Sequence, residues 1–139
     1  MSGASITVRD DLAGVDWDAL SSALTADRFN NGRTPAELRR SFENSYATAI
    51  VGGGRAVVAT ARVLADGVCN AGLVDVWTES GHRRRGFGSA VVRRLLERVP
   101  GHHVALFTEH RTEFYEQLGF EEERTGMSLV VGSWLDRPG

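Results

Sequence analysis

Apolar and polar positions follow two different periods along this chain, and the changes of period predict its elements. Apolar runs rich in β-branched residues predict strands over 6–9, 46–51, 55–64, 71–78, 103–107 and 125–131. Apolar positions spaced three or four apart predict helices from about Asp16, from Pro35, over 86–99 and over 112–118. Thr34 and Glu37 give the second helix a capping box, with Pro35 at its first position.

The order of these elements predicts a mixed sheet. Three glycines at 52–54 separate two apolar runs, so the strands on either side are expected to form an antiparallel hairpin. The strand at 71–78, the helix at 86–99 and the strand at 103–107 require a parallel pair with a right-handed crossover. With 139 residues and no repeat or linker, the chain is expected to be a single domain over 1–139.

Composition limits the class of protein without identifying it. A hydrophobic content of 42% with 24% charged residues is ordinary for a soluble globular protein. No targeting peptide is visible at Met1 and no apolar run approaches the length of a membrane span, which predicts a cytoplasmic protein without a membrane partner. The single cysteine, Cys69, leaves no disulfide framework, and we expect it to be a buried apolar residue.

The basic residues are unusual in their type and in their distribution along the chain. All 16 basic residues are arginine, and six of them lie between 83 and 98, although the net charge is only −2. There is therefore no overall basic field for nucleic acid, while a polyanionic small ligand would explain the local cluster. The absence of lysine excludes Schiff-base chemistry. His102, His103 and His110 lack the spacing of metal ligands, so no metal is expected.

The turn between the strand at 71–78 and the following helix is the main candidate for a binding site. Gly86 and Gly88 remove Cβ atoms that would keep an anion away from the backbone N–H groups, and the helix start adds unpaired amides. A phosphate or diphosphate cradle is the hypothesis, with a plain glycine turn and solvated arginines as the alternative. A dinucleotide fingerprint is excluded because Val91 stands where the third glycine is needed.

Two motifs in this order resemble one known family. Arg83-x-x-Gly86-x-Gly88 is similar to the acyl-CoA-binding signature of the GNAT superfamily of N-acyltransferases, and the segment from Phe114 to Phe120 resembles its Phe-Tyr-x-x-x-Gly-Phe segment. The resemblance implies a GNAT-like α/β (α+β) fold. Its central sheet would be mixed and mostly antiparallel, with about six or seven strands, a splayed parallel pair at the site and about four flanking helices.

The resemblance also implies acetyl-CoA as cosubstrate and a set of residues that bind it. The pantetheine arm would follow the strand end, the diphosphate would lie on the turn, and Thr108 stands where many relatives have an asparagine that contacts the pantetheine. The expected cofactor-binding residues are Val76, Trp77, Thr78, Arg83, Arg84, Arg85, Gly86, Phe87, Gly88, Ser89, Thr108, Phe114 and Tyr115.

For catalysis, the resemblance implies direct attack of an amine on the thioester. The backbone N–H near Thr78 would stabilise the oxyanion, and Tyr115 would protonate the departing sulfur. The general base is open: Asp75 and Glu79 are the candidates, acting directly or through water, and Asp75 is the one we select. The acceptor pocket is expected to use Phe29, Asn30, Trp77 and Met127.

Three functions are compatible with these patterns. The first is an acetyl-CoA-dependent N-acetyltransferase acting on a primary amine of a small molecule or of a protein. The second is a non-catalytic acyl-CoA-binding sensor, which would keep the cradle and lack turnover. The third, a nucleic-acid-binding protein, would show steeply salt-dependent affinity and is the least favoured. The family resemblance also suggests a homodimer.

Overall fold

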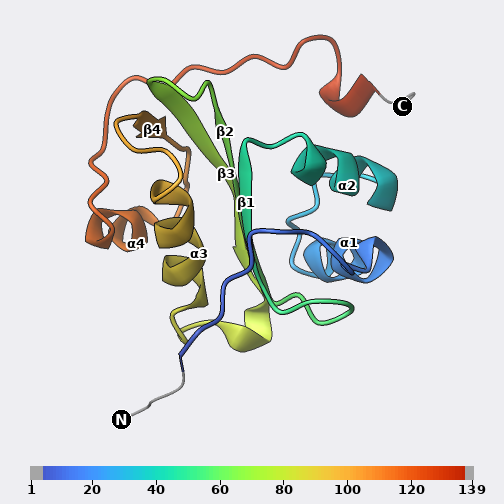
Figure 1. The fold of residues 1–139 in the computed structure, drawn as a ribbon. Coiled ribbons are helices and arrows are strands. Elements are labelled where there is room, and N and C mark those ends of the chain that lie inside the picture. The colour runs from blue at the N-terminus through green and yellow to red at the C-terminus, as the bar shows by residue number, and fades with distance from the viewer. Residues whose placement is uncertain (1–4, 137–139) are drawn as a thin grey trace. The chain divides into compact units, whose positions relative to one another are not determined.

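The computed structural model describes residues 5–136. Of these, the residues up to Leu106 form one compact unit and those from Phe107 form a second. The first unit contains a four-stranded sheet in the order β1-β2-β3-β4 (Figure 1). Its strands are β1 (Ala47–Val51), β2 (Ala59–Ala65), β3 (Asn70–Thr78) and β4 (His103–Ala105). The first three run antiparallel and β4 runs parallel to β3, so the predicted mixed sheet is confirmed.

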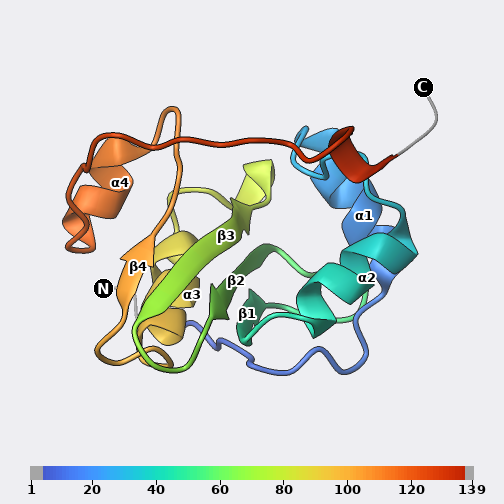
Figure 2. The same ribbon diagram turned by 90° about the horizontal axis from the view of Figure 1, so that it is seen from above.

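Helices of the first unit cover both faces of this sheet. They are α1 (Trp17–Ala26), α2 (Pro35–Glu43) and α3 (Phe87–Leu96), with a short 3-10 turn, η1, at Ser80–His82. Both views show α1 and α2 on one face and α3 on the other (Figures 1 and 2). The hydrophobic core under α1 and α2 includes Leu24, Phe42, Ile50 and Trp77.

The helix starts follow the local signals in the sequence. Asp16 accepts a hydrogen bond from the Ala19 N–H at the start of α1. At the start of α2, Thr34 and Glu37 form the predicted reciprocal capping box and Pro35 occupies the first position. These bonds satisfy backbone donors that have no partner inside a helix, so α1 and α2 each begin directly after a capping residue.

Two predicted strands do not form in the described part of the chain. Of residues 6–9, only Arg9 pairs with β1, through a single antiparallel bridge to Ile50. In that register residues 7 and 6 would lie opposite positions 52 and 53, which are past the end of β1 at Val51. Residues 125–131, in the second unit, contain no strand. An apolar pattern supplies side chains for a strand but not a neighbour to pair with, and the sheet therefore has four strands rather than six or seven.

The second unit is described by itself. It contains α4 (Thr112–Gln117) and a short 3-10 turn, η2, at Trp134–Asp136. Gly119 follows α4 with φ of 100°, the left-handed conformation expected after a helix. The prediction of a single domain stays a prediction.

Two further expectations concern exposure and membranes. Cys69 is exposed, so its predicted burial is wrong. It lies in the turn between β2 and β3, where Asp66 accepts hydrogen bonds from the N–H groups of Val68, Cys69 and Asn70, and a side chain in such a turn is directed to solvent. In the part of the chain that the structure describes, every helix is too short or too polar to cross a lipid bilayer.

Candidate active site

The two parallel strands of the sheet separate early. β3 pairs with β4 only through residues 70–72, opposite 103–105, and then continues to Thr78 without a strand neighbour on that side in the first unit. On the other side, the Glu79 N–H donates to the Val58 carbonyl. Because N–H directions alternate along an antiparallel ladder, the Thr78 N–H is turned away from β2 and toward the edge without a neighbour.

A bulge interrupts β3 within this free edge. The pairing with β2 shifts between Thr60 and Arg62, and Asp75 on β3 has φ of 53°, a left-handed conformation within a strand. The Thr60 hydroxyl donates to the Asp75 carbonyl at 2.9 Å. The bulge is therefore fixed on its backbone side by a hydrogen bond from the neighbouring strand.

The Asp75 side chain is the centre of a buried ion cluster. Its carboxylate accepts two hydrogen bonds from the Arg33 guanidinium, at 2.9 and 3.1 Å, and one from Arg62 Nε at 2.6 Å. Burial raises the pKa of the Asp75 carboxyl, but the hydrogen bonds and charges of Arg33 and Arg62 outweigh it and hold the pKa below its usual value. A carboxylate that stays ionised with both oxygens occupied is poorly suited to accept a proton from an amine.

The turn after β3 leads to a helix start without a side-chain cap. Gly86 is the N-cap residue of α3, with φ of 84°, and Arg84 is also left-handed with φ of 66°. The first intrahelical bond is the one from the Ala90 N–H to the Gly86 carbonyl. The N–H groups at 87–89 therefore have no acceptor inside the helix, and a helix start of this kind is suited to bind an anion.

The three predicted arginines differ in what they contact. Arg83 donates through Nε to the Thr78 carbonyl at 3.2 Å, and its Nη2 lies 3.9 Å from Asp27 Oδ2. It braces the turn. Arg84 and Arg85 are exposed at the same corner and form no ion pair with another described residue. These two side chains, with the uncapped amides of α3, fit a diphosphate.

Two residues expected in the acceptor pocket have buried side chains. Trp77 is 2% exposed in the core under α1 and α2, and its indole donates to Asp27 Oδ2 at 2.9 Å. Asn30 is 5% exposed and donates to the Arg33 carbonyl at 2.7 Å. Both side chains are therefore held inside the fold, while the backbone of Trp77 lies on the free part of β3; their place in an acceptor pocket stays a prediction. Phe29 is half-buried against the same core.

Val76 lies on the free part of β3, and four predicted residues belong to the second unit: Thr108, Phe114, Tyr115 and Met127. The Tyr115 ring lies edge-on to those of Phe114 and Phe120, with ring centres 4.9 and 5.7 Å away. Burial raises the pKa of Tyr115, opposed by the charge of Arg111, so the phenol is protonated at neutral pH. The Thr108 hydroxyl accepts from the Arg111 N–H at 3.1 Å. Met127 is 87% exposed.

Three residues that organise this region are not indicated as site residues by the sequence: Asp27, Arg33 and Arg62. Arg62 carried a usable signal, because a charge inside an apolar strand needs a partner when the strand is buried. Asp27 and Arg33 carried none, because both stand in a polar loop where charged residues are ordinary.

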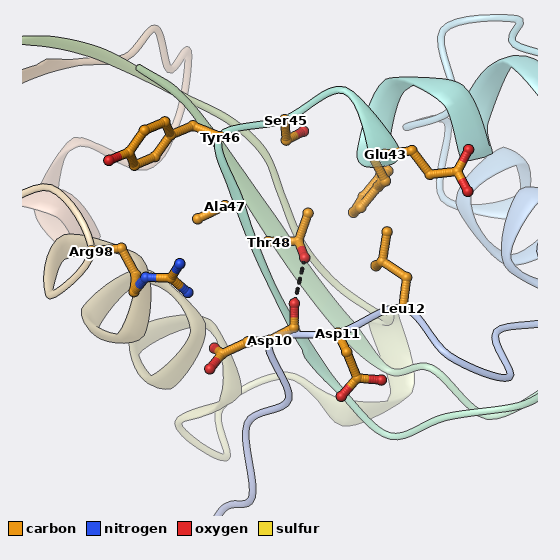
Figure 3. A pocket seen from close by; sticks show the side chains of 10 residues that line it. Asp10, Asp11, Leu12, Glu43, Ser45, Tyr46, Ala47, Thr48 and Arg98 are labelled. Carbon is orange, nitrogen blue, oxygen red and sulfur yellow. Dashed lines mark hydrogen bonds between the residues drawn. The ribbon is translucent and has the colours of Figure 1, made fainter. Parts of the chain in front are cut away.

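A pocket of about 400 Å³ lies elsewhere in the first unit, beside β1 and lined by none of the predicted site residues. Figure 3 shows the Asp10 carbonyl of its wall bound to the Thr48 hydroxyl. The Asp10 carboxylate is held by two hydrogen bonds from Arg94, so it is not free for a ligand. Among the described residues, no group of three or more His, Cys, Asp or Glu is placed to hold a metal ion.

Comparison with known proteins identifies the family. The sequence profile of the acetyltransferase (GNAT) domain matches residues 44–122, more than half of the chain. The chain belongs to the GNAT acetyltransferase family. It is 34% identical over 129 residues to serotonin N-acetyltransferase 2, chloroplastic, of Oryza sativa, covering 86% of this chain and 64% of that protein. It is 29% identical over 132 residues to histone acetyltransferase TAP1 of Glycine max, covering 83% and 57%. The chain thus spans about three fifths of the length of these curated relatives.

Solved structures agree on the fold. A GNAT family acetyltransferase of Streptococcus pneumoniae superposes with a TM-score of 0.75 at 24% identity, covering 93% of this chain and all of that one. Glucosamine-6-phosphate N-acetyltransferase of Arabidopsis thaliana superposes with a TM-score of 0.69 at 19% identity, covering 91% and 99%. The GNAT-like α/β fold expected from the sequence is therefore confirmed.

Proposed function

We propose that this protein is an acetyl-CoA-dependent N-acetyltransferase that moves the acetyl group to a primary amine by direct attack in a ternary complex. One observation carries the proposal: the free edge of β3 ends at Thr78, and the turn that follows leads directly to the uncapped start of α3 with its exposed arginines. Membership of the GNAT acetyltransferase family supports it.

The chain's own groups have separate tasks in this reaction. Acetyl-CoA supplies an activated thioester carbonyl. The amides at 87–89, with Arg84 and Arg85, hold the diphosphate. The Thr78 N–H is fixed before the reaction and stabilises the negative charge that develops on the carbonyl oxygen. The Tyr115 hydroxyl gives its proton to the departing sulfur, and its raised pKa keeps that proton available at neutral pH.

The amine must lose a proton, and the structure favours Glu79 over Asp75 for that task. Asp75 has both oxygens occupied by arginines. Glu79 follows Thr78 directly, and its side chain is 38% exposed, with Oε1 at 2.6 Å from His82 Nδ1. We assign proton removal to Glu79, acting directly or through one water. Asp75 takes a structural task instead.

The acceptor is proposed only as a primary amine, on a small molecule or on a protein. Two relatives are named for such acceptors, serotonin and histone. The expected cytoplasmic location and the homodimer stay predictions, and the rice relative is named as chloroplastic.

The test is an acceptor screen that follows thiol release from acetyl-CoA. Arylalkylamines, aliphatic amines and lysine-containing peptides are offered in separate reactions with the purified chain. Release that depends on the amine, with an acetylated product seen by mass spectrometry, supports the proposal. Acetyl-CoA binding without transfer to any of these amines contradicts it and favours the sensor.

A further inference from the structure

The loop between α1 and α2 is tied at both of its ends to the last part of β3 and the turn after it. We propose that Asp27 and Asp75 are positioning residues, which hold this loop and residues 75–80 as one unit around the Thr78 amide. The inference rests on the proposed acetyl transfer for its catalytic consequence. The coupling of the two segments stands on the contacts alone.

The first tie joins the end of the loop to the bulge. Arg33 binds the Asp75 carboxylate through both terminal nitrogens, and the two side chains are only 6% and 8% exposed. Arg62 from β2 adds a third hydrogen bond, and its side chain is 15% exposed. In this buried cluster, a two-pronged guanidinium fixes direction as well as distance. The loop end and the bulge therefore cannot shift independently.

The second tie joins the start of the loop to the residues on both sides of Thr78. Asp27 Oδ2 accepts from the Trp77 indole at 2.9 Å and from the Ser80 N–H at 3.1 Å. The Asp27 side chain is only 11% exposed. One carboxylate oxygen thus binds both the Trp77 side chain in the core and the backbone of η1 at Ser80. Because Asp75 is also fixed, Thr78 lies between residues that are held in place on both sides.

Internal hydrogen bonds and fixed backbone conformations make the loop between α1 and α2 rigid. The Arg33 Nε donates to the Asn30 carbonyl at 2.9 Å, and the Asn30 amide donates back to the Arg33 carbonyl at 2.7 Å. Arg28 and Asn31 have φ of 58° and 56°, in the left-handed region. Residues other than glycine keep such conformations only where the surrounding structure fixes them. The loop can therefore transmit a restraint from one tie to the other.

Loss of the hydrogen bonds of either tie would shift the Thr78 N–H and would leave the anion-binding amides at the start of α3 in place. The cradle depends on the start of α3, whereas the direction of the Thr78 N–H depends on the bulge at Asp75 and on the turn held by Asp27. Small misplacements of an oxyanion donor lower the rate without removing binding energy at a distant group. Loss of either tie is thus expected to lower kcat and leave acetyl-CoA affinity unchanged.

The experiment compares Arg33→Lys and Asp27→Asn with the control Arg39→Lys. Both test variants keep the size of the side chain and replace a directed contact, while Arg39 belongs to an exposed ion pair with Glu43, with side chains 59% and 49% exposed. We expect kcat to fall about tenfold or more in both test variants, with the acetyl-CoA Kd within about threefold of wild type. The control keeps both constants.

A second readout is hydrogen exchange, which does not depend on turnover. In either test variant, amides at 28–33 and at 76–80 should exchange faster together, while those of α2 and α3 keep their protection. Unchanged kcat in the folded variants, or faster exchange confined to the substituted segment, would overturn the proposal. If the wild type transfers no acetyl group, only the proposed function is contradicted. The coupling of the two segments is then still tested by hydrogen exchange: faster exchange in both segments supports it, and faster exchange in one segment alone contradicts it.

Discussion

Tyr115 is the single residue whose chemistry can be tested most directly. Burial raises the pKa of its phenol above the ordinary 10.0, against the charge of Arg111, so the proton is retained through the neutral range. Tyr115→Phe should lower kcat by about 100-fold, the smaller end of general-acid effects, and leave the acetyl-CoA Kd unchanged. Thiol release and calorimetry measure the two constants. An unchanged kcat between about pH 6 and pH 9 would contradict the acid role.

The ionisation of the Asp75 carboxyl should make the stability of the fold depend on pH. Burial raises the pKa of its carboxyl, but Arg33 and Arg62 lower it more, to below 3.8. A depressed folded-state pKa means that the carboxylate stabilises the fold above the unfolded value, and that this stabilisation is lost as the pH falls through the folded value. The free energy of unfolding should therefore drop more steeply in wild type than in Asp75→Asn between about pH 5 and pH 2. Urea titrations in this range measure both slopes, and parallel slopes contradict the assignment.

At the scale of elements, the start of α2 offers a test of stability alone. The Thr34 hydroxyl accepts from the Glu37 N–H at 3.1 Å, and Glu37 accepts from the Thr34 N–H at 2.8 Å. Thr34→Ala removes one of these bonds and should destabilise the protein by about 1 kcal/mol. Thr25→Ala, at an exposed position in α1, is the matched control. Equal urea midpoints for the two variants would show that the cap contributes nothing.

The start of α3 offers a test of binding. Arg84 and Arg93 are both exposed, but Arg84 lies before the helix start and Arg93 in its last turn. Arg84→Glu should weaken acetyl-CoA binding about tenfold or more, because a carboxylate beside the uncapped amides repels the diphosphate. Arg93→Glu makes the same change of charge and should have an effect below about threefold at physiological salt. Equal losses in calorimetric titrations would mean that only net charge matters.

For the whole molecule, the order of elements was predictable because it depends on signals that are close together in the sequence. The cap at Thr34, the glycines at 52–54 and the glycines at the start of the helix predicted over 86–99 each belong to a few adjacent residues. They were enough to predict the antiparallel hairpin, the parallel crossover and the uncapped helix start, all of which the structure contains.

The contacts that organise the site were not predictable in the same way. Arg33 and Asp75 are 42 positions apart, and Asp27 and Trp77 are 50 apart, so their hydrogen bonds exist only once the sheet and the loop have packed. The burial of Trp77 and the exposure of Cys69 were unpredictable for the same reason, because both depend on how the elements pack. Local pattern shows which residues suit a strand or a turn, and tertiary packing decides which of their side chains reach solvent.

The proposed function requires that the start of α3 and the free edge of β3 bind acetyl-CoA. Calorimetric titration of the purified wild-type protein with acetyl-CoA tests it most directly, with the double variant Arg84→Glu, Gly86→Asp as the control. We expect one binding site with a Kd on the order of micromolar in wild type and no measurable binding in the folded double variant. A folded wild-type protein that binds neither acetyl-CoA nor longer acyl-CoAs would contradict the assignment of this site.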